Sequence, residues 1–340
     1  MSVRYSTSLL ALSIAMAAVG LVSPAAAQQW VLPRTPEGHP DLQGNWSNAT
    51  ITPFQRPEGR EPILTWDEVA ELEGTAGARA INDSDRVAAV PGGRVGGSDG
   101  QGGDLSYNSV YLDRGELVAV INGEPRASLL MNPPDGRRPP LTPAGQRRVE
   151  ESREFRSQFG TYDNPETRPL GERCIVSFGT NAGPPMLPNG FYNNNYTIVQ
   201  TADHVLIMTE MVHDVRIIRL GEPDPLPTQV RPWFGDSWGR WEGDTLVVET
   251  TNLNPRHPFR GIPTTDALTI TERFSRVDDG TVVYEFTIDD PTTYTQPWGG
   301  QLPFRKMDEL LYEYSCHEGN YALEGILSGA RYLELQEAGN

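Results

Sequence analysis

Lysine is almost missing from this sequence of 340 residues, in which Lys306 stands alone. Schiff-base and PLP chemistry both need a lysine and would depend on that one residue, and no G-K-[ST] phosphate loop exists. Positive charge is scarce as well, because 28 Lys and Arg residues face 45 Asp and Glu residues, for a formal net charge of -17. A chain this acidic repels phosphate backbones, so we expect no nucleic-acid partner.

Long apolar runs are also scarce, and after the first residues none approaches the ~18 residues of a membrane span. The start of the chain is different. Residues 1–27 combine Arg4, an apolar stretch over residues 9–22 and three alanines at residues 25–27, which predicts a secretory signal cleaved near Ala27. We therefore expect a periplasmic or secreted protein without a membrane span.

Cysteine occurs only twice, at Cys174 and Cys316. In an oxidising compartment an even pair predicts one disulfide, and two buried free thiols are the alternative. The bond would close a loop of about 140 residues and stabilise the fold by about 4–5 kcal/mol on the chain-entropy interpretation. Because no C-x-x-C and no Cys/His cluster is present, we expect no structural zinc, and we predict no cofactor.

Glycine and proline are plentiful, with 34 and 29 residues, and they indicate many turns and irregular connections. Two short helices are predicted in the N-terminal half. One begins at Thr65, which forms a capping box with Glu68. The other covers residues 142–159, with Thr142 as its cap and Pro143 at its first helical position.

Strand patterns dominate the rest of the chain, and tight turn signals join several of them without an intervening helix. The predicted strands are residues 44–46, 116–122, 126–132, 195–201, 204–211, 214–220, 237–241, 245–252, 267–277, 281–290 and 308–318. This pattern predicts a mainly β fold, an antiparallel β-barrel of the lipocalin or calycin kind, with a sandwich as the alternative.

The domain prediction follows from the position of these patterns. Residues 28–340 are expected to form a single β-barrel domain, in which a segment of residues 28–160 wraps a barrel core of residues 161–335. A separate small N-terminal domain is the alternative. A barrel of about eight to ten strands can enclose a pocket for one small ligand.

Three glutamates share a predicted strand face with apolar side chains, because residues i and i+2 of a strand point the same way. They are Glu210, Glu272 and Glu318. Since burial of a lone carboxylate is costly, each must be paired, protonated or functional, and a raised pKa would suit acid–base work. The alternative is a buried ion pair, for which Arg216 or Arg273 could serve.

Two histidines are the strongest candidates for proton transfer. His213 stands beside Asp214 where one strand turns into the next, and His317 stands beside Glu318 next to the predicted disulfide. A histidine beside carboxylates at a barrel mouth can take or give a proton near neutral pH. A surface or hydrogen-bonded structural histidine is the alternative. The remaining histidines lie at Pro-flanked or turn positions and are predicted to be structural: His39, His204 and His257.

A ligand-binding role is predicted for the segment of residues 183–196, which combines a rigid turn with amides and phenols. The predicted substrate-binding residues are Tyr192, Asn195, Tyr196, Glu272 and Trp298. For each aromatic residue, simple core packing is the alternative. A G-x-S-x-G match at residues 235–239 precedes a hairpin pattern rather than a helix, so we predict no serine hydrolase.

Several long segments resemble a large family of secreted bacterial proteins. The segments are NPPDGRRPPLTP, GPPMLPNGFYNNNY, EMVHDVRII, GRWEGDTLVVETTN and YEYSCHEGNYAL, and the resemblance covers roughly residues 36–331. Such proteins are abundant in bacteria that degrade aromatic and plant-derived compounds. The resemblance therefore implies a catabolic enzyme for small aromatic compounds, with lignin-derived dimers as one substrate class.

Three hypotheses for function result. The first is a cofactor-independent lyase of the decarboxylase, deformylase or isomerase type, which acts on a small phenolic or lignin-derived aromatic by general acid–base catalysis. Its predicted catalytic residues are His213, Asp214, Glu210, Arg216, His317 and Glu318. The alternatives are a lipocalin-like binding protein for a hydrophobic aromatic ligand and a metal-dependent hydrolase.

Overall fold

The computed structural model describes residues 30–88, 113–177, 181–190, 192–222 and 224–339. The predicted secretory signal lies outside these described residues. Every helix and strand named below belongs to one compact unit, Leu32–Asn340. Among the described residues, no helix has both the length and the apolar character that crossing a membrane requires.

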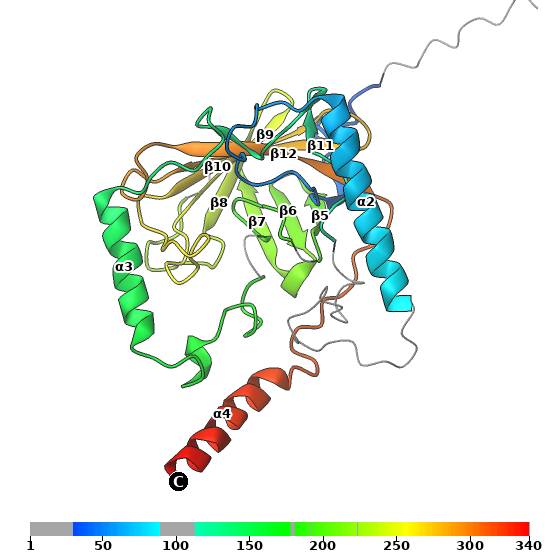
Figure 1. Ribbon diagram of the computed structural model, residues 1–340. Helices are drawn as coiled ribbons and strands as arrows, with labels where there is room; N and C mark the ends of the chain where they lie inside the picture. Colours follow the sequence, from blue (N-terminus) through cyan, green and yellow to red (C-terminus); the bar gives the residue numbers. More distant parts are fainter. Residues whose placement is uncertain (1–29, 89–112, 178–180, 191, 223, 340) are drawn as a thin grey trace, which may run out of the picture. The chain divides into compact units, whose positions relative to one another are not determined.

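In the described part of the chain, nine strands close into a β-barrel (Figure 1). Strands β5 to β12 pair in chain order, and β1 closes the barrel by pairing with both β5 and β12. The barrel strands are β1 (Gly44–Ser47), β5 (Asn195–Gln200), β6 (His204–Thr209), β7 (Val215–Leu220), β8 (Asp236–Glu242), β9 (Thr245–Thr251), β10 (Thr269–Arg276), β11 (Thr281–Asp289) and β12 (Trp298–Met307). The predicted mainly β barrel is confirmed, and β7 and β8 are the one parallel pair among these strands.

The predicted strand pair before the barrel forms a shorter hairpin. Strands β2 (Val120–Ile121) and β3 (Glu124–Pro125) pair across the turn at Asn122 and Gly123, both of which have positive φ. Strand β4 (Leu130–Asn132) leaves this hairpin and pairs with β12. The N-terminal segment therefore joins the barrel sheet at β1 and β4.

The prediction of a strand at residues 308–318 is wrong, because this segment is a loop. Leu310 and Tyr312 in it are 81% and 84% exposed. Since β1 and β12 pair with each other, the closed barrel offers no free edge at which this segment could add as a further strand. The alternating apolar side chains of this segment therefore have no sheet against which to pack.

The strand that the sequence pattern missed is β12, in which Gly299 and Gly300 interrupt the alternation. Both glycines lie against neighbouring backbone. A Cβ atom would lie 2.1 Å from the carbonyl oxygen of Phe286 at Gly299 and 2.2 Å from that of Leu129 at Gly300. Glycine in a strand often marks such a close backbone approach, and this constraint is visible only in three dimensions.

Aromatic side chains fill the interior of the barrel. Trp46, Tyr196, Tyr284 and Phe304 are fully shielded from solvent. The ring of Phe304 lies 5.1 Å from that of Tyr196 and 5.3 Å from that of Tyr284. Truncating one such ring to alanine costs roughly 3–5 kcal/mol. The centre of the barrel is therefore a packed core, and space for a ligand has to be sought at its ends.

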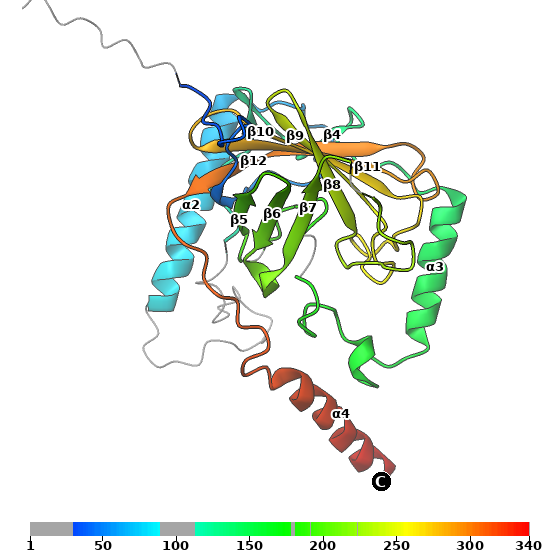
Figure 2. The ribbon, with the colours of Figure 1, turned by 180° about the vertical axis from the view of Figure 1, so that it is seen from behind.

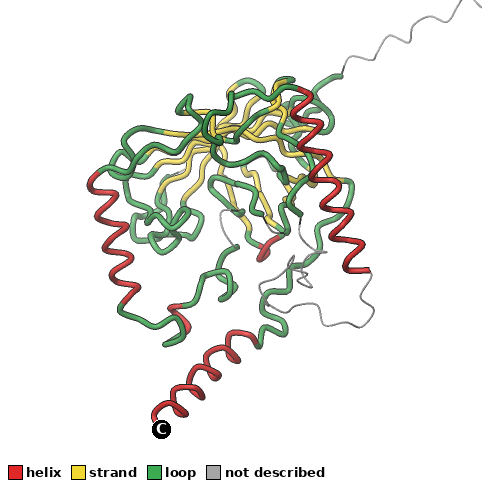
Figure 3. The backbone as a smooth tube through the Cα atoms, viewed as in Figure 1, coloured by secondary structure: helices red, strands yellow, loops and turns green. Residues whose placement is uncertain are grey.

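The two predicted helices are confirmed, and they lie outside the barrel strands (Figures 2 and 3). Helix α2 (Trp66–Ala88) begins with the expected capping box, in which Glu68 accepts from the Thr65 backbone and the Thr65 hydroxyl accepts from the Glu68 backbone. Helix α3 (Pro143–Ser157) begins after Thr142, whose hydroxyl accepts from the Gly145 backbone at 3.0 Å. A third helix, α4 (Ala322–Ala338), was not predicted from the sequence pattern.

The predicted disulfide is confirmed, because Cys174 and Cys316 are bonded to each other. It joins residues 171–177 to the loop that follows β12. A second contact supports the same junction, since the Asn320 side chain donates to the carbonyl of Glu172 at 3.3 Å. The C-terminal loop is thereby held against the segment that precedes β5.

Candidate functional site

Strand register places two connections at the same end of the barrel. The turn between β6 and β7, residues 210–214, follows the end of β6, which pairs with the start of β5. The connection between β9 and β10, residues 252–268, adjoins the start of β12 through the end of β11. Strand β1 runs antiparallel to both β5 and β12 and pairs the start of β5 with Arg305 near the end of β12, so β5 and β12 run in the same direction. The β6–β7 turn and the apolar pocket described below therefore lie towards the same end of the barrel.

The carboxylates in the β6–β7 turn bind backbone groups. Glu210, 7% exposed, accepts from the Asn195 side chain at 2.8 Å and from the backbone N–H of Tyr312 at 3.2 Å. Asp214 accepts from the backbone N–H of Ser177 at 2.9 Å. The backbone of His213 belongs to the short helix η3 (Met211–His213), and its side chain lies outside what the structure describes. These carboxylates attach the C-terminal loop and residues 171–177 to the barrel.

Arg216 and Glu272 form an ion pair inside the barrel, as the structural alternative predicted. The two side chains are 1% and 0% exposed, and the guanidinium contacts both carboxylate oxygens, at 2.9 and 2.5 Å. The Tyr284 hydroxyl donates to Glu272 at 2.7 Å and accepts from the backbone of Met186 at 2.9 Å. Burial, reinforced by the charge of Glu272, raises the pKa of Tyr284 well above its ordinary value. No member of this network faces a cavity described below.

The predicted substrate-binding residues are dispersed. Tyr196 is buried, and its hydroxyl donates to the carbonyl of Asn181 at 2.8 Å and accepts from Asn48 at 3.0 Å. Asn195 binds Glu210 as described above. Tyr192 lies beside Tyr314, whose pKa burial and this neighbour raise to about 12. The fully buried Trp298 has its ring 5.7 Å from that of Phe259.

His317 and Glu318 lie on the exposed loop after the disulfide, and not on a strand face as predicted. The reason is the absence of a strand at residues 308–318. Within the part of the chain that the structure describes, no three His, Cys, Asp or Glu side chains gather where they could hold a metal ion. The metal-dependent hydrolase therefore has no candidate site among these residues.

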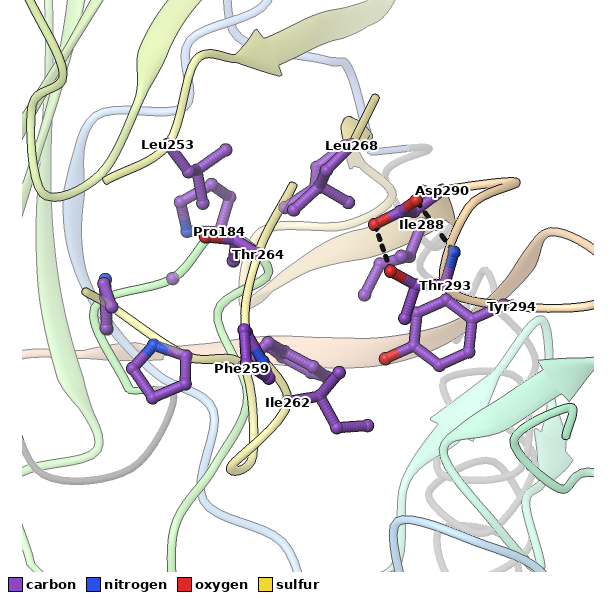
Figure 4. Close-up of a pocket in the computed structure, with 15 residues that line it drawn as sticks. Pro184, Leu253, Phe259, Ile262, Thr264, Leu268, Ile288, Asp290, Thr293 and Tyr294 are labelled. Atoms are coloured by element: carbon purple, nitrogen blue, oxygen red, sulfur yellow. Dashed lines mark hydrogen bonds between the residues drawn. The ribbon is translucent and has the colours of Figure 1, made fainter. Parts of the chain in front are cut away.

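A small cavity of about 30 Å³ lies at this end of the barrel (Figure 4). Most of its wall comes from the β9–β10 connection, and the rest from the ends of β10 and β11, the segment after β11 and a buried proline before β5. The lining residues used below are His257, Phe259, Ile262, Pro184, Asp290 and Tyr294. The wall is mainly apolar, and a few polar side chains converge on it, which is the usual composition of a small-molecule site.

His257 is the titratable base of this pocket. Its Nδ1 atom lies 3.0 Å from the carbonyl oxygen of Trp233. Because a carbonyl can only accept, Nδ1 carries the proton and Nε2 is left as the acceptor. Burial lowers the pKa of His257 below its ordinary value, although the hydrogen bond to Trp233 opposes this effect. The imidazole is therefore neutral at neutral pH and able to accept a proton.

Tyr294 is the proton donor of the same pocket. Its side chain is 4% exposed, and Figure 4 shows the hydroxyl directed towards Phe259 and Ile262. Burial raises the pKa of Tyr294 to about 12, so the phenol stays protonated at neutral pH. Asp290 holds this part of the chain in place, because it accepts from the backbone and the hydroxyl of Thr293 at 3.0 and 2.6 Å.

A tight turn connects this pocket to a second cavity. Phe259 and Ile262 exchange two backbone hydrogen bonds of 2.9 Å, and Arg260 and Gly261 between them have φ values of 49° and 80°. Two successive positive φ values define the turn that Asn-Gly sequences favour. For a residue other than glycine, asparagine or aspartate, this conformation costs roughly 1–2 kcal/mol.

The second cavity, of about 170 Å³, adjoins that turn and is lined by Arg260, Arg114 and Phe54 among others. The wall between the two cavities is aromatic. Trp298 packs against Phe54 of the second cavity, with ring centroids 6.1 Å apart, and against Phe259 and Tyr294 of the first. The two cavities are therefore neighbours across one layer of side chains.

Comparison with known proteins finds no protein family that matches this chain and no curated protein that matches it. The function proposed below therefore rests on the chemistry of the site.

Sequence reasoning missed His257, which was predicted to be structural because prolines flank it. One signal was available. The connection between β9 and β10, residues 252–268, is long for a hairpin loop, and long loops with no helix or strand of their own are often functional. A histidine and two arginines, Arg256 and Arg260, stand together in this loop.

Proposed function

We propose that this protein is an enzyme that acts on a small phenolic compound by general acid–base catalysis, without a cofactor, in the cavity between the β9–β10 connection and the barrel. One observation carries the proposal. His257 is a neutral base whose tautomer is set by the Trp233 carbonyl, and it shares an apolar pocket with the protonated phenol of Tyr294. The resemblance of the long sequence segments to secreted proteins of aromatic-degrading bacteria supports the substrate class.

The chemistry requires only a base, an acid and a dry pocket. Nε2 of His257 takes the proton of the substrate phenol, and the phenolate electron pair moves through the ring to the para side chain. A carbon of that side chain then takes a proton, for which Tyr294 is the donor. Where that carbon carries a carboxylate, its C–C bond then breaks, carbon dioxide leaves, and the bonding electron pair returns through the ring to the phenolate oxygen. That oxygen takes its proton back from His257, and Tyr294 regains its proton from solvent, which completes a lyase reaction.

Substrate entry requires movement of the β9–β10 connection. A cavity of about 30 Å³ holds one water molecule, so an aromatic ring can enter only when residues 252–268 move outward. Closure of this connection over the substrate would exclude water from the ring and from His257, as active-site loops do in many enzymes. The proposal places the enzyme in the periplasm or outside the cell, which the predicted signal and the disulfide support.

The test compares wild-type protein with His257→Gln on a panel of phenolic monomers and dimers, with products followed by mass spectrometry. His204→Gln is the matched control, because His204 is an exposed histidine paired with Asp203 at 2.9 Å. We expect the His257 variant to lose activity by about 10²- to 10⁴-fold, the usual contribution of general acid–base catalysis. The control is expected to keep wild-type rates.

A third variant, His213→Gln, separates the two histidines at this end of the barrel. Loss of turnover in His213→Gln with full activity in His257→Gln would move the reaction to the β6–β7 turn and overturn the assignment made here. Loss of activity in both variants would indicate one shared site.

A ligand-binding protein is the second candidate, and the mainly apolar wall of the cavity favours it. It predicts that the same phenols bind and are recovered unchanged. It also predicts that His257→Gln alters affinity by less than about tenfold, since only one hydrogen bond is lost.

A further inference from the structure

Arg260 is an exposed arginine with no anionic partner in the described part of the chain. Its guanidinium lies over the ring of Phe54, 3.9 Å from the ring centroid. The structure gives it neither a hydrogen bond nor an ion pair among the described residues, although an arginine carries five N–H donors. Stacking covers one face of the guanidinium and leaves the donors at its edge.

Two of the more buried arginines of the chain have anionic partners. Arg216 pairs with Glu272, and Arg168 pairs with Glu172 at 2.7 Å. Arg260 instead shares the lining of its cavity with a second cation, Arg114, and burial and then the charge of Arg138 lower the pKa of Arg260. In a chain with a net charge of -17, two neighbouring cations without a carboxylate are a marked local exception.

The backbone adds an independent observation. Arg260 occupies the first of the two left-handed positions in the turn between Phe259 and Ile262, where asparagine or glycine is favoured. An arginine at this position is unfavourable for the backbone and, with Arg138 nearby, unfavourable for charge. Strained positions of this kind cluster at ligand-binding sites, where the side chain is needed for another reason.

We propose that Arg260 binds the carboxylate of a ligand whose aromatic ring lies in the pocket of His257 and Tyr294. The proposal rests on the proposed function for the position of the ring, and it names the substrate class as aromatic carboxylates. Arg260 follows Phe259 of the ring pocket directly in the chain and lines the adjacent cavity of about 170 Å³.

A planar anion fits this site better than a phosphate. The free donors of a stacked guanidinium lie in one plane, which matches the two oxygens of a carboxylate in a bidentate contact. Leu129, Leu187 and Pro188 line the same cavity. This apolar part of the wall favours a singly charged group over one with two charges to desolvate.

Calorimetric binding of benzoate and of its neutral counterpart benzamide tests the proposal without any need for turnover. We expect wild-type protein to prefer benzoate by about tenfold or more, as a hydrogen-bonded charge pair provides. Arg260→Asn is expected to abolish this preference. Arg260→Lys keeps the charge without the planar fork and is expected to retain only part of it. Arg153→Asn is the matched control, since Arg153 is an exposed arginine on helix α3, and it should leave the preference unchanged.

Thermal unfolding of the same variants separates a binding role from a structural one. Arg260→Asn is expected to raise the unfolding temperature while it removes the benzoate preference, because asparagine suits the turn and relieves the repulsion with Arg138. A lowered unfolding temperature with an unchanged benzoate preference would overturn the proposal, because Arg260 would then serve the fold. Equal binding of benzoate and benzamide by wild-type protein, or binding of neither, would overturn it as well.

Inorganic phosphate is the remaining probe. If phosphate displaces benzoate and binds more tightly in an Arg260-dependent way, the site is a phosphate site and the carboxylate assignment is wrong. Failure of the proposed function gives a different result. In that case no phenol is turned over, while the benzoate preference and its dependence on Arg260 persist.

Discussion

Two groups of buried polar side chains in this protein differ in how completely they satisfy one another. Inside the barrel, Arg216, Glu272 and Tyr284 bind each other, and the Tyr284 hydroxyl also accepts from the Met186 backbone. At the barrel end, the three side chains assigned to the site, His257, Tyr294 and Arg260, each have one hydrogen bond or none to described residues. His257 uses one ring nitrogen on Trp233, and the hydroxyl of Tyr294 has no hydrogen-bond partner among the described residues.

The difference separates structural from functional burial of polar groups. A charged residue on an apolar face was a catalytic candidate in the sequence, yet the interior residues bind one another and line neither of the two cavities at the barrel end, and the Nε atom of Arg216 is their one buried donor without a described partner. At the barrel end, Nε2 of His257, the hydroxyl of Tyr294 and the guanidinium of Arg260 lie beside cavities without a described hydrogen-bond partner. Unused hydrogen-bonding capacity next to a cavity is therefore the better indicator of a site here than burial of charge.

The largest expected effect tests the interior group. Glu272→Ala should lower the free energy of unfolding by about 3–5 kcal/mol, because it leaves the charge of Arg216 buried without a partner. Urea denaturation measures this loss. The double variant Arg216→Met/Glu272→Leu should recover most of the stability, since it removes both charges and keeps the volume. A loss below about 1 kcal/mol in Glu272→Ala would show that the ion pair is not the closed unit inferred here.

The second prediction compares the same substitution, tyrosine to phenylalanine, at two buried positions. Tyr284→Phe removes a donor to Glu272 and an acceptor for Met186, and should cost about 1–3 kcal/mol in unfolding free energy. Tyr294→Phe removes a hydroxyl without a described partner and should change stability by less than about 0.5 kcal/mol. The order is expected to reverse for activity. Equal costs in denaturation would mean that Tyr294 is as firmly bonded as Tyr284.

The smallest expected effect is a pH dependence that His257 introduces. Its pKa is lowered in the folded protein, so between that value and about 6.5 the unfolded chain binds the proton more readily. Its contribution to stability is therefore fully present above about pH 6.5 and is lost as pH falls through the folded pKa. The difference in unfolding free energy between wild type and His257→Gln, followed from pH 7.5 to 5, should shrink towards acid. A difference that is flat or grows towards acid would contradict the buried neutral histidine.

Local patterns predicted what depends on neighbouring residues. The capping box at Thr65, the helix cap at Thr142 and the barrel strands from residue 195 to 290 all follow from spacings of a few residues, and the disulfide follows from the presence of only two cysteines. The pattern failed at β12 and at residues 308–318. In β12, Gly299 and Gly300 are required by contacts with backbone that is distant in the chain. Residues 308–318 find no free edge of the closed barrel with which to pair.

The candidate site was predictable only in its chemistry. A histidine as base, a buried carboxylate in an ion pair and an aromatic pocket were each expected, but the residues were partly different ones. An ion pair was predicted as the alternative role of Glu272, and Arg216, 56 residues away, was correctly named as a possible partner. His257 was predicted to be structural because its flanking prolines indicate a turn. The position of a turn in the sequence does not show which cavity that turn covers in the folded protein.

The sequence by itself determined the class of fold, the disulfide partners and the acidic character of the chain, because alternation, cysteine number and net charge are properties of composition and local order. Only the tertiary structure decided which polar groups are satisfied and which are not. Burial and hydrogen-bond partners depend on the register in which distant strands meet. That register enclosed Glu272 with Arg216 in the barrel core and left His257, Tyr294 and Arg260 beside open space at its end.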